Sequence, residues 1–236
     1  MTRPGKEKFK TRNDVFDEHT NRNLFMLASK GYFEEGSLSP ISMGKEANIF
    51  SAKKKDGKKI IIKIYRVNTC DFNRMYDLLK GDPRFPKLTK NRREVVYSWN
   101  QREFKNLHRA RDAGVAVPTP YLAKENILLM EFIGDDTAAP KLQTQRNVDK
   151  KFMEEVIKNM RKLHKEKLVH GDLSPFNILN YHNKPIFIDF SQAMEIDTMQ
   201  FETMFDRDVR NIANFFNKTD VPVTEDYIRR KVLSKK

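Results

Sequence analysis

The chain has 236 residues and is 39% hydrophobic, which is enough apolar side chain for a buried core in one domain or in two packed lobes. Its single cysteine, Cys70, excludes an internal disulfide and any zinc site built from several cysteines. Lysine and arginine outnumber aspartate and glutamate by 45 to 32, and the net charge of +13 favours a polyanionic partner such as RNA, with solvated surface charge as the alternative. No apolar run reaches the length of a membrane span and the first residues lack a signal sequence, so we expect a cytoplasmic protein.

The amino-terminal part of the chain predicts an arm, a helix and a hairpin. Residues 1–13 are basic, polar and poor in apolar side chains, which is typical of a mobile arm. Apolar positions over 15–28 fit a short packing helix. Residues 41–50 and 60–65 then flank Asp56-Gly57, a strong turn signal, and predict an antiparallel pair of strands.

Two features of this hairpin suit the phosphates of a nucleotide. Lys63 lies among isoleucines, and strand alternation turns it to the same half-buried face as Ile61 and Tyr65. A buried ammonium costs several kcal/mol unless it is paired, and a phosphate with a partner carboxylate would pair it. The loop with Ser42 and Gly44 allows backbone amides to approach anionic oxygens. An edge-strand charge and an ordinary turn are the alternative interpretations.

The carboxylate partner of Lys63 is predicted on the next helix. The apolar side chains over 92–111 fit one broad helical face. Glu103 on this helix is the first candidate, and Glu94 is the alternative. The stretch 68–90 before the helix has the glycine, prolines and mixed charges of an insertion that is partly loop.

An apolar run over 127–134 predicts a buried strand that leads into a connection between two lobes. Backbone groups of Glu131 and Ile133 would then be placed to hydrogen-bond adenine. We therefore predict an N-terminal extension and nucleotide-binding lobe over 14–134, followed by a catalytic lobe with a basic tail over 135–236.

The stretch from His170 to Leu179 and on to Asp189 carries the strongest chemical signal. Magnesium takes oxygen ligands, one or two of them from the protein in nucleotide enzymes, and Asn177 and Asp189 would supply those two. A loop carboxylate five residues before such an asparagine is the protein-kinase arrangement, so Asp172 is predicted to accept the proton of the attacking hydroxyl. The alternative is a polar turn in which Asp172 and Asn177 cap local backbone.

Amphipathic patterns predict two helices in the second lobe, over 149–165 and 201–218, each with a buried apolar stripe. Asp208 lies beside the second stripe. An acid at this position is a candidate for holding the backbone of the catalytic loop by hydrogen bonds.

Seven ordered motifs resemble the RIO family of atypical serine/threonine protein kinases, over about 15–218. They are Ser42-Met43-Gly44-Lys45-Glu46-Ala47-Asn48-Ile49-Phe50, Ile62-Lys63-Ile64-Tyr65, Gly81-Asp82-Pro83-Arg84-Phe85, Arg102-Glu103-Phe104-Lys105-Asn106-Leu107, Leu129-Met130-Glu131-Phe132-Ile133-Gly134, His170-Gly171-Asp172-Leu173-Ser174 and Arg207-Asp208-Val209-Arg210-Asn211-Ile212. The Gly-Lys-Glu-Ala-Asn form is similar to the type-one subgroup.

The resemblance implies an α+β, two-lobed protein-kinase-like fold. Its C-terminal lobe would be truncated and lack the usual activation segment and substrate-binding helices, in agreement with the 47 residues that follow Asp189. It implies ATP with Mg²⁺ or Mn²⁺ as cofactors and a protein substrate or the chain itself as phosphoacceptor. It also implies a role in maturation of the small ribosomal subunit, with the subunit precursor and its rRNA as partners.

The resemblance further implies a role for single residues, which are carried over by motif. Lys63 would contact the phosphates beside the Ser42 and Gly44 loop, and Glu103 would pair with Lys63. Glu131 and Ile133 would hold adenine. Asp172 would accept the proton of the attacking hydroxyl, and Asn177 and Asp189 would bind magnesium. Asp189 is also the position implicated as a transient phosphoaspartate, which makes some members ATPase-like switches. The insertion has threonines but no serine, so the family's site of self-phosphorylation has no direct counterpart.

Two other classes of protein remain as alternatives. A small-molecule kinase of the aminoglycoside or choline type shares a similar Asp-x4-Asn loop, but generally has a larger helical substrate lobe than this chain provides. A non-catalytic basic scaffold that binds ribonucleoprotein would also explain the charge.

Overall fold

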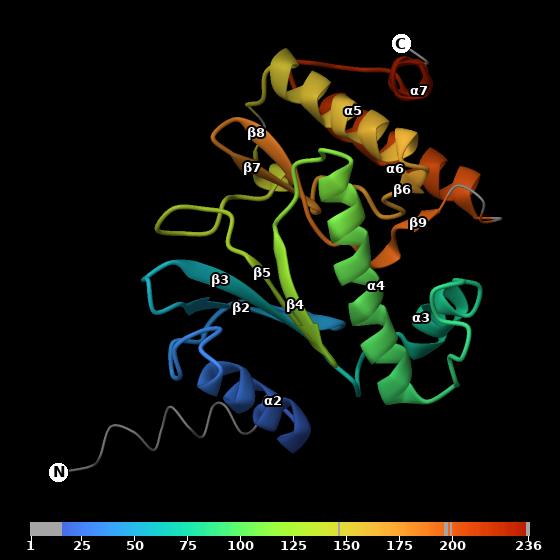
Figure 1. Ribbon diagram of the computed structural model, residues 1–236. Coiled ribbons are helices and arrows are strands. Elements are labelled where there is room, and N and C mark those ends of the chain that lie inside the picture. Colours follow the sequence, from blue (N-terminus) through green and yellow to red (C-terminus); the bar gives the residue numbers. More distant parts are fainter. Residues whose placement is uncertain (1–15, 146, 196–197, 199, 235–236) are drawn as a thin grey trace. The chain divides into compact units, whose positions relative to one another are not determined.

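The computed structural model describes residues 16–145, 147–195, 198 and 200–234 (Figure 1). The chain divides into two compact units, of which the first comprises Met1–Asn100 and Tyr121–Met130 and the second Gln101–Pro120 and Glu131–Lys236. The arm predicted over residues 1–13 lies outside the described residues. Within the described ranges, no helix combines the length and the apolar character needed to cross a bilayer.

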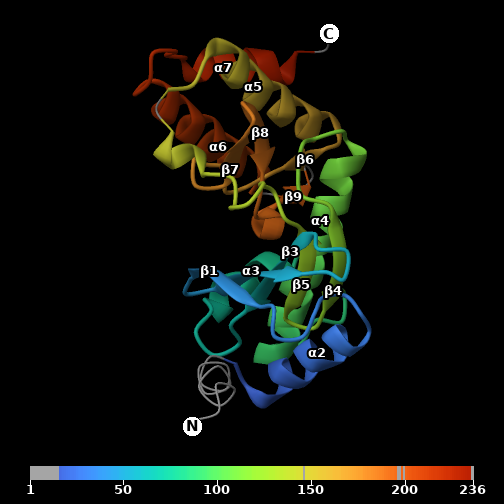
Figure 2. The same cartoon turned by 90° about the vertical axis from the view of Figure 1, so that its left-hand side faces the viewer.

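A five-stranded sheet forms the centre of the first unit (Figures 1 and 2). Its order is β1-β2-β3-β5-β4, with β1 Ser39–Met43, β2 Ala47–Lys53, β3 Lys59–Tyr65, β4 Pro120–Lys124 and β5 Ile127–Glu131. The antiparallel pair predicted around Asp56-Gly57 is confirmed as β2 and β3, and Gly57 has a positive φ of 79° in the turn between them.

The prediction of residues 41–50 as a single strand is wrong. This stretch contains the end of β1, a turn and the start of β2, which pair antiparallel with each other. Gly44 explains the break, because its N–H donates to the Ala47 carbonyl at 3.1 Å. A Cβ at this position would meet the same oxygen at 2.8 Å, so the close turn requires glycine.

Helix α2 (Glu18–Ser29) packs on one face of this sheet. The Asp17 side chain caps its first turn by accepting from the Thr20 N–H, and Gly31, with a φ of 80°, follows its end. The helix predicted over 15–28 is therefore confirmed for its described part. The cluster beneath it consists of Leu24, Leu27, Phe33, Phe50, Ala52, Ile60, Ile62, Ile64, Ile127 and Leu129.

A second apolar cluster of the first unit joins Tyr65 at the end of β3 to two further helices. These are α3 (Phe72–Leu79) and the first half of α4 (Arg92–Asp112). The cluster consists of Tyr65, Cys70, Met75, Leu79, Val95, Val96 and Trp99. Helix α3 lies inside the predicted insertion, which is thus partly helical and partly loop.

Beyond α4, the described residues of the second unit form further helices and two small sheets (Figure 1). The helices are α5 (Lys150–Lys165), α6 (Phe201–Phe216) and α7 (Glu225–Leu233), with short 3-10 helices η1 (Leu142–Thr144) and η2 (Phe190–Gln192). Antiparallel pairs form between β6 (Leu168–Val169) and β9 (Met194–Glu195), and between β7 (Ile178–Tyr181) and β8 (Lys184–Phe187). The apolar stripes predicted for the first two helices are buried, as expected.

The second half of α4 belongs to the second unit rather than to the first. Buried polar side chains explain this. Arg102 donates to the Ala193 carbonyl at 3.2 Å, and the Asn106 amide donates to the Phe190 and Ala193 carbonyls, both at 2.9 Å. The two units therefore divide within α4, whereas the sequence placed the whole of 14–134 in one lobe.

Candidate active site

Lys63 lies on β3 opposite Ile49 of β2 and is only 5% exposed. Its ammonium lies 5.0 Å from the centroid of the Tyr65 ring, whereas the alternate residues Ile62 and Ile64 pack in the cluster beneath α2. Lys63 therefore lies on the same face of β3 as Tyr65, as strand alternation predicted. A cation–π contact contributes about 0.5–2 kcal/mol, which is less than the several kcal/mol that burial of an ammonium costs. Lys63 thus requires an anionic neighbour as well.

The turn between β1 and β2 holds Ser42 at the end of one strand and Gly44 in the turn itself. Three successive carbonyls of this turn accept hydrogen bonds from a segment beyond β3. Arg66 donates through its side chain to the Gly44 carbonyl at 3.2 Å and through its backbone N–H to the Glu46 carbonyl at 2.8 Å. The Thr69 hydroxyl donates to the Lys45 carbonyl at 2.8 Å.

Glu103 lies on the second half of α4 and is 1% exposed, so its carboxylate is as deeply buried as Lys63. Because the two residues belong to different units, their pairing stays a prediction. The alternative, Glu94, accepts hydrogen bonds from both the backbone N–H and the hydroxyl of Thr89. This engagement makes Glu103 the better candidate.

The predicted adenine contacts begin at the end of β5. The Glu131 N–H donates to the Thr119 carbonyl at 2.8 Å, and the Ile133 carbonyl accepts from the Ala139 N–H at 2.9 Å. A contact with adenine would therefore use the Glu131 carbonyl and the Ile133 N–H. The Glu131 side chain has a structural role, since one carboxylate oxygen accepts from the Thr119 N–H at 2.9 Å and from its hydroxyl at 2.7 Å.

Asp172 and Asn177 face each other across the loop that connects β6 to β7. The Asn177 amide nitrogen donates to the Asp172 carbonyl at 2.9 Å and lies 3.4 Å from a carboxylate oxygen of the same residue. Both side chains are partly exposed, whereas Leu173 and Ile178 are buried at 1% and 0% exposure and fix the loop to the core. The loop thus presents an acid and an amide at a reachable surface.

Asp189 joins this pair through the β7–β8 hairpin. Ile178 pairs with Phe187, and the Ile188 N–H donates to the Asn177 carbonyl at 3.0 Å, so Asp189 follows directly beyond that contact. Its backbone is left-handed, with φ 64° and ψ 69°. Such a conformation is unfavourable for a residue other than glycine and is frequent at functional sites.

Asp208 of α6 holds the backbone of the predicted catalytic loop. Its two carboxylate oxygens accept from the Gly171 N–H at 2.8 Å and the Leu173 N–H at 2.7 Å, which confirms the predicted role. The carboxyl is 2% exposed, and this burial raises its pKa to about 7, although the two backbone N–H groups lower it.

The sequence did not single out two further residues of α6 that hold the same loop. Arg207 donates to the Gly171 carbonyl, and its guanidinium lies 3.7 Å from a carboxylate oxygen of Asp172. The Asn211 amide donates to the Leu173 carbonyl at 3.0 Å. Both residues belong to the motif that contains Asp208, so the signal that could have found them was their spacing on one helix.

The donor set around the loop fits a magnesium ion. The amide nitrogen of Asn177 is directed to Asp172, so the amide oxygen is the atom that can meet a cation. The Ser191 hydroxyl donates to one carboxylate oxygen of Asp189 at 2.8 Å, which fixes the orientation of that carboxylate. One carboxylate and one amide oxygen match the few protein ligands that magnesium takes beside a nucleotide.

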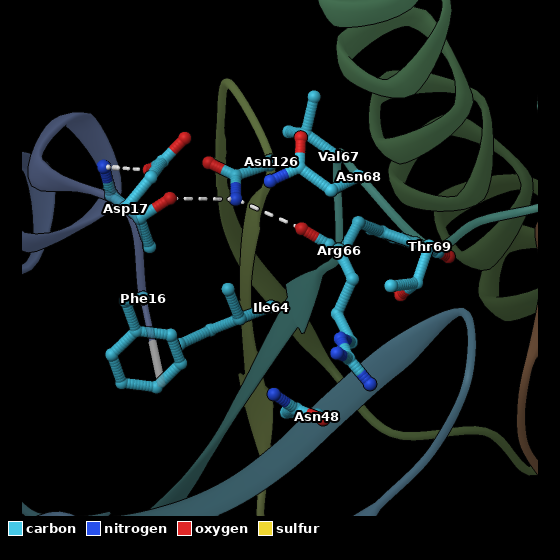
Figure 3. Close-up of a pocket in the computed structure, with 11 residues that line it drawn as sticks. Phe16, Asp17, Asn48, Ile64, Arg66, Val67, Asn68, Thr69 and Asn126 are labelled. Atoms are coloured by element: carbon cyan, nitrogen blue, oxygen red, sulfur yellow. Dashed lines mark hydrogen bonds between the residues drawn. The ribbon is translucent and has the colours of Figure 1, made fainter. Parts of the chain in front are cut away.

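A cavity of about 350 Å³ lies elsewhere in the first unit, beside the start of α2 (Figure 3). It is lined by Phe16 and Asp17, by Asn48 and Asn126, and by the segment that follows β3. None of the predicted site residues lines it. The cavity is therefore distinct from the predicted nucleotide contacts of this unit.

Asp208 gives a testable pH dependence. Because its pKa is raised from 3.8 to about 7 in the folded chain, the folded state binds the proton more tightly than the unfolded state. This preference stabilises the fold fully below about pH 4 and is lost as the pH rises toward 7, at a cost on the order of a few kcal/mol. Urea unfolding between pH 4.5 and 8 should therefore show a steeper loss of stability with pH for the natural chain than for Asp208→Asn. Parallel profiles would contradict the raised pKa.

Comparison with known proteins gives a consistent family. Residues 48–228 match the RIO domain. The chain is 40% identical to the RIO-type serine/threonine-protein kinase Rio1 of Haloferax volcanii over 90% of its own length and 73% of that protein. The corresponding kinase of Methanocaldococcus jannaschii is also 40% identical, over 91% of this chain and 74% of that protein.

A similar fold is found in the crystal structure of the Rio2 kinase–ADP/Mg²⁺–phosphoaspartate complex from Chaetomium thermophilum, with a TM-score of 0.67. The match covers 89% of this chain and 64% of that one at 24% identity, so it bears on the α+β kinase-like fold alone. The domain match and the two close relatives show that this chain belongs to the RIO family of serine/threonine protein kinases.

Proposed function

We propose that the chain uses ATP and magnesium, or manganese in its place, to phosphorylate protein hydroxyls, and that it also acts as an ATPase switch during maturation of the small ribosomal subunit. The proposal is supported by the placement of Asp172 and Asn177 on one loop, with Asp189 next to the residue that bonds the Asn177 backbone. Asn177 contacts Asp172 through its side chain, and its carbonyl accepts from the residue before Asp189. These three groups are what phosphoryl transfer requires of a protein.

In the kinase reaction, Asp172 accepts the proton of the attacking hydroxyl. Arg207 lies 3.7 Å from a carboxylate oxygen of Asp172 and would help to orient it. Asn177 and Asp189 would hold magnesium, which when bound neutralises charge on the phosphate oxygens. Lys63 and the turn at Gly44 would hold the same phosphates from the first unit.

In the ATPase reaction, we propose that Asp189 is the nucleophile. One carboxylate oxygen would form a bond to the terminal phosphorus of ATP while the bond to the bridging oxygen breaks and ADP leaves. Water would then cleave the acyl phosphate to give phosphate and the free carboxylate. The left-handed backbone at Asp189 and the hydrogen bond from Ser191 support this role, because they fix the direction of the carboxylate.

We also propose that the second unit is truncated and that its described residues include no separate activation segment. After Asp189 the chain forms η2 directly, then β9 and α6. Asp208 on that helix and the neighbouring Arg207 contact the loop backbone themselves. The helix therefore supplies support that needs no additional segment.

The first test of the proposal is turnover by isosteric variants. Asp172→Asn should retain ATP binding but lose about 10²- to 10⁴-fold in kcat, because it removes a general base. Asp189→Asn should instead lose magnesium-dependent ATP binding. Asp220→Asn, at an exposed position away from the loop, is the matched control. The measurements are calorimetric ATP binding and phosphate release.

Turnover retained in both variants would overturn the enzymatic assignment of this trio. The alternatives would give other results in the same assays. Phosphorylation of an aminoglycoside or choline without any protein phosphorylation would favour a small-molecule kinase, and absence of turnover in the natural chain would favour a scaffold.

A second prediction concerns the covalent intermediate. Incubation with ATP labelled at the terminal phosphate should transfer label to the natural chain in a form that hydroxylamine removes, because an acyl phosphate is cleaved by this nucleophile. Asp189→Asn should carry no such label, whereas Asp220→Asn should carry the normal amount. A label that resists hydroxylamine in the natural chain would show a phosphorylated hydroxyl and contradict the phosphoaspartate.

The net charge of +13 supports the proposed ribosomal partner. The chain should cosediment with precursors of the small subunit, and its affinity should fall at least about tenfold between 50 and 200 mM salt, because contacts with RNA phosphates release counterions. Equal binding to small and large subunits at every salt concentration would contradict this assignment.

A further inference from the structure

The segment Arg66–Cys70, which follows β3, is the feature from which a new role can be argued. It connects two parts of the first unit: the turn between β1 and β2, and the start of α4. Figure 3 shows the side chains of Arg66 and Thr69 extending from this segment.

On one side, the segment contacts every residue of the Gly44–Glu46 turn. Arg66 donates to the Gly44 carbonyl at 3.2 Å and the Glu46 carbonyl at 2.8 Å, and Thr69 donates to the Lys45 carbonyl at 2.8 Å. Three successive carbonyls are thus oriented toward the segment. Because the carbonyl and N–H of a peptide unit point in opposite directions, this arrangement also fixes where the N–H groups of the turn point.

On the other side, the segment is anchored to α4. The guanidinium of Arg92, the first residue of that helix, donates to the Val67 carbonyl at 3.3 Å and the Asn68 carbonyl at 3.4 Å. It also lies 5.1 Å from the centroid of the Phe72 ring. The segment therefore links the helix to the turn through hydrogen bonds at both of its sides.

Apolar packing holds only part of this segment, since Cys70 belongs to the second apolar cluster and Val67 packs against it. Arg66, Asn68 and Thr69 are exposed, and only Cys70 is buried, at 6% exposure. The segment also lines the 350 Å³ cavity beside α2, so that side offers open space rather than packed side chains. Hydrogen bonds are thus the main restraint on the exposed residues Arg66 and Thr69.

We propose that Arg66–Cys70 is a strap that positions the Gly44–Glu46 turn for the phosphates of ATP, with Thr69 as its main positioning residue. This inference rests on the proposed assignment of that turn to the nucleotide. The turn has one hydrogen bond of its own, from the Gly44 N–H to the Ala47 carbonyl, and the strap adds three more to its successive carbonyls.

The test compares Thr69→Val, which removes the hydroxyl at nearly constant volume, with Thr69→Ser, which keeps it. Thr219→Val is the matched control, because the Thr219 hydroxyl also donates to a backbone carbonyl, at 2.8 Å, but lies in the second unit after α6. Binding of ATP with magnesium and of adenosine is measured by calorimetry, together with hydrogen exchange of the peptide that covers residues 43–47.

Thr69→Val should weaken ATP binding about two- to tenfold, as expected for one lost hydrogen bond, and leave adenosine binding unchanged, since adenosine has no phosphates. Exchange in the 43–47 peptide should accelerate. Thr69→Ser should keep the ATP affinity and the exchange rate of the natural chain, and Thr219→Val should alter neither.

Two results would overturn the strap while leaving the proposed function intact. One is normal ATP affinity and normal exchange in Thr69→Val. The other is an equal loss of ATP and adenosine binding, which would indicate general damage to the unit. A natural chain that bound no ATP would instead overturn the proposed function, and the role of the strap with it.

Discussion

The buried carboxylate of Asp208 is the constraint on which the catalytic loop depends. A loop that carries polar side chains to a reachable surface cannot be fixed by apolar packing alone, and its backbone N–H groups cost free energy if they are buried without partners. Asp208 satisfies two of them, on either side of Asp172. The cost is a desolvated acid whose pKa is raised to about 7, so the support for the loop is itself sensitive to proton concentration.

The β7–β8 hairpin completes this geometry in the second unit. Its turn residues His182 and Asn183 have positive φ angles of 49° and 57°, the conformation that a tight two-residue hairpin requires. Pairing of Ile178 with Phe187 then brings the residues just outside each strand to the same end of the ladder. Asn177 therefore lies opposite Ile188, whose N–H donates to the Asn177 carbonyl, and Asp189 follows as the next residue along the chain.

Much of this arrangement was predictable from sequence, because its signals are local. Apolar periodicity located α5 and α6, and the spacing from Asp172 to Asn177 identified the loop. The loop at Gly44 was predicted, but the sequence did not show that it separates two paired strands, which the close contact with the Ala47 carbonyl requires. The position of Arg207 was also missed, since alternation and periodicity carry no information about which distant carbonyl a guanidinium will reach.

In both units, side-chain hydrogen bonds restrain the backbone of the predicted functional loop. Side chains from a neighbouring element hold backbone groups of the loop, through Arg207, Asp208 and Asn211 in the second unit and through Arg66 and Thr69 in the first. A single hydrogen bond of this kind contributes about 0.5–1.5 kcal/mol net, which is small beside the cost of opening a core. Loss of one such bond therefore shifts the loop without unfolding its unit. At Arg66, Thr69 and Asn211, such a loss should therefore displace the loop before it lowers the stability of the unit, whereas the buried charge of Asp208 also affects stability.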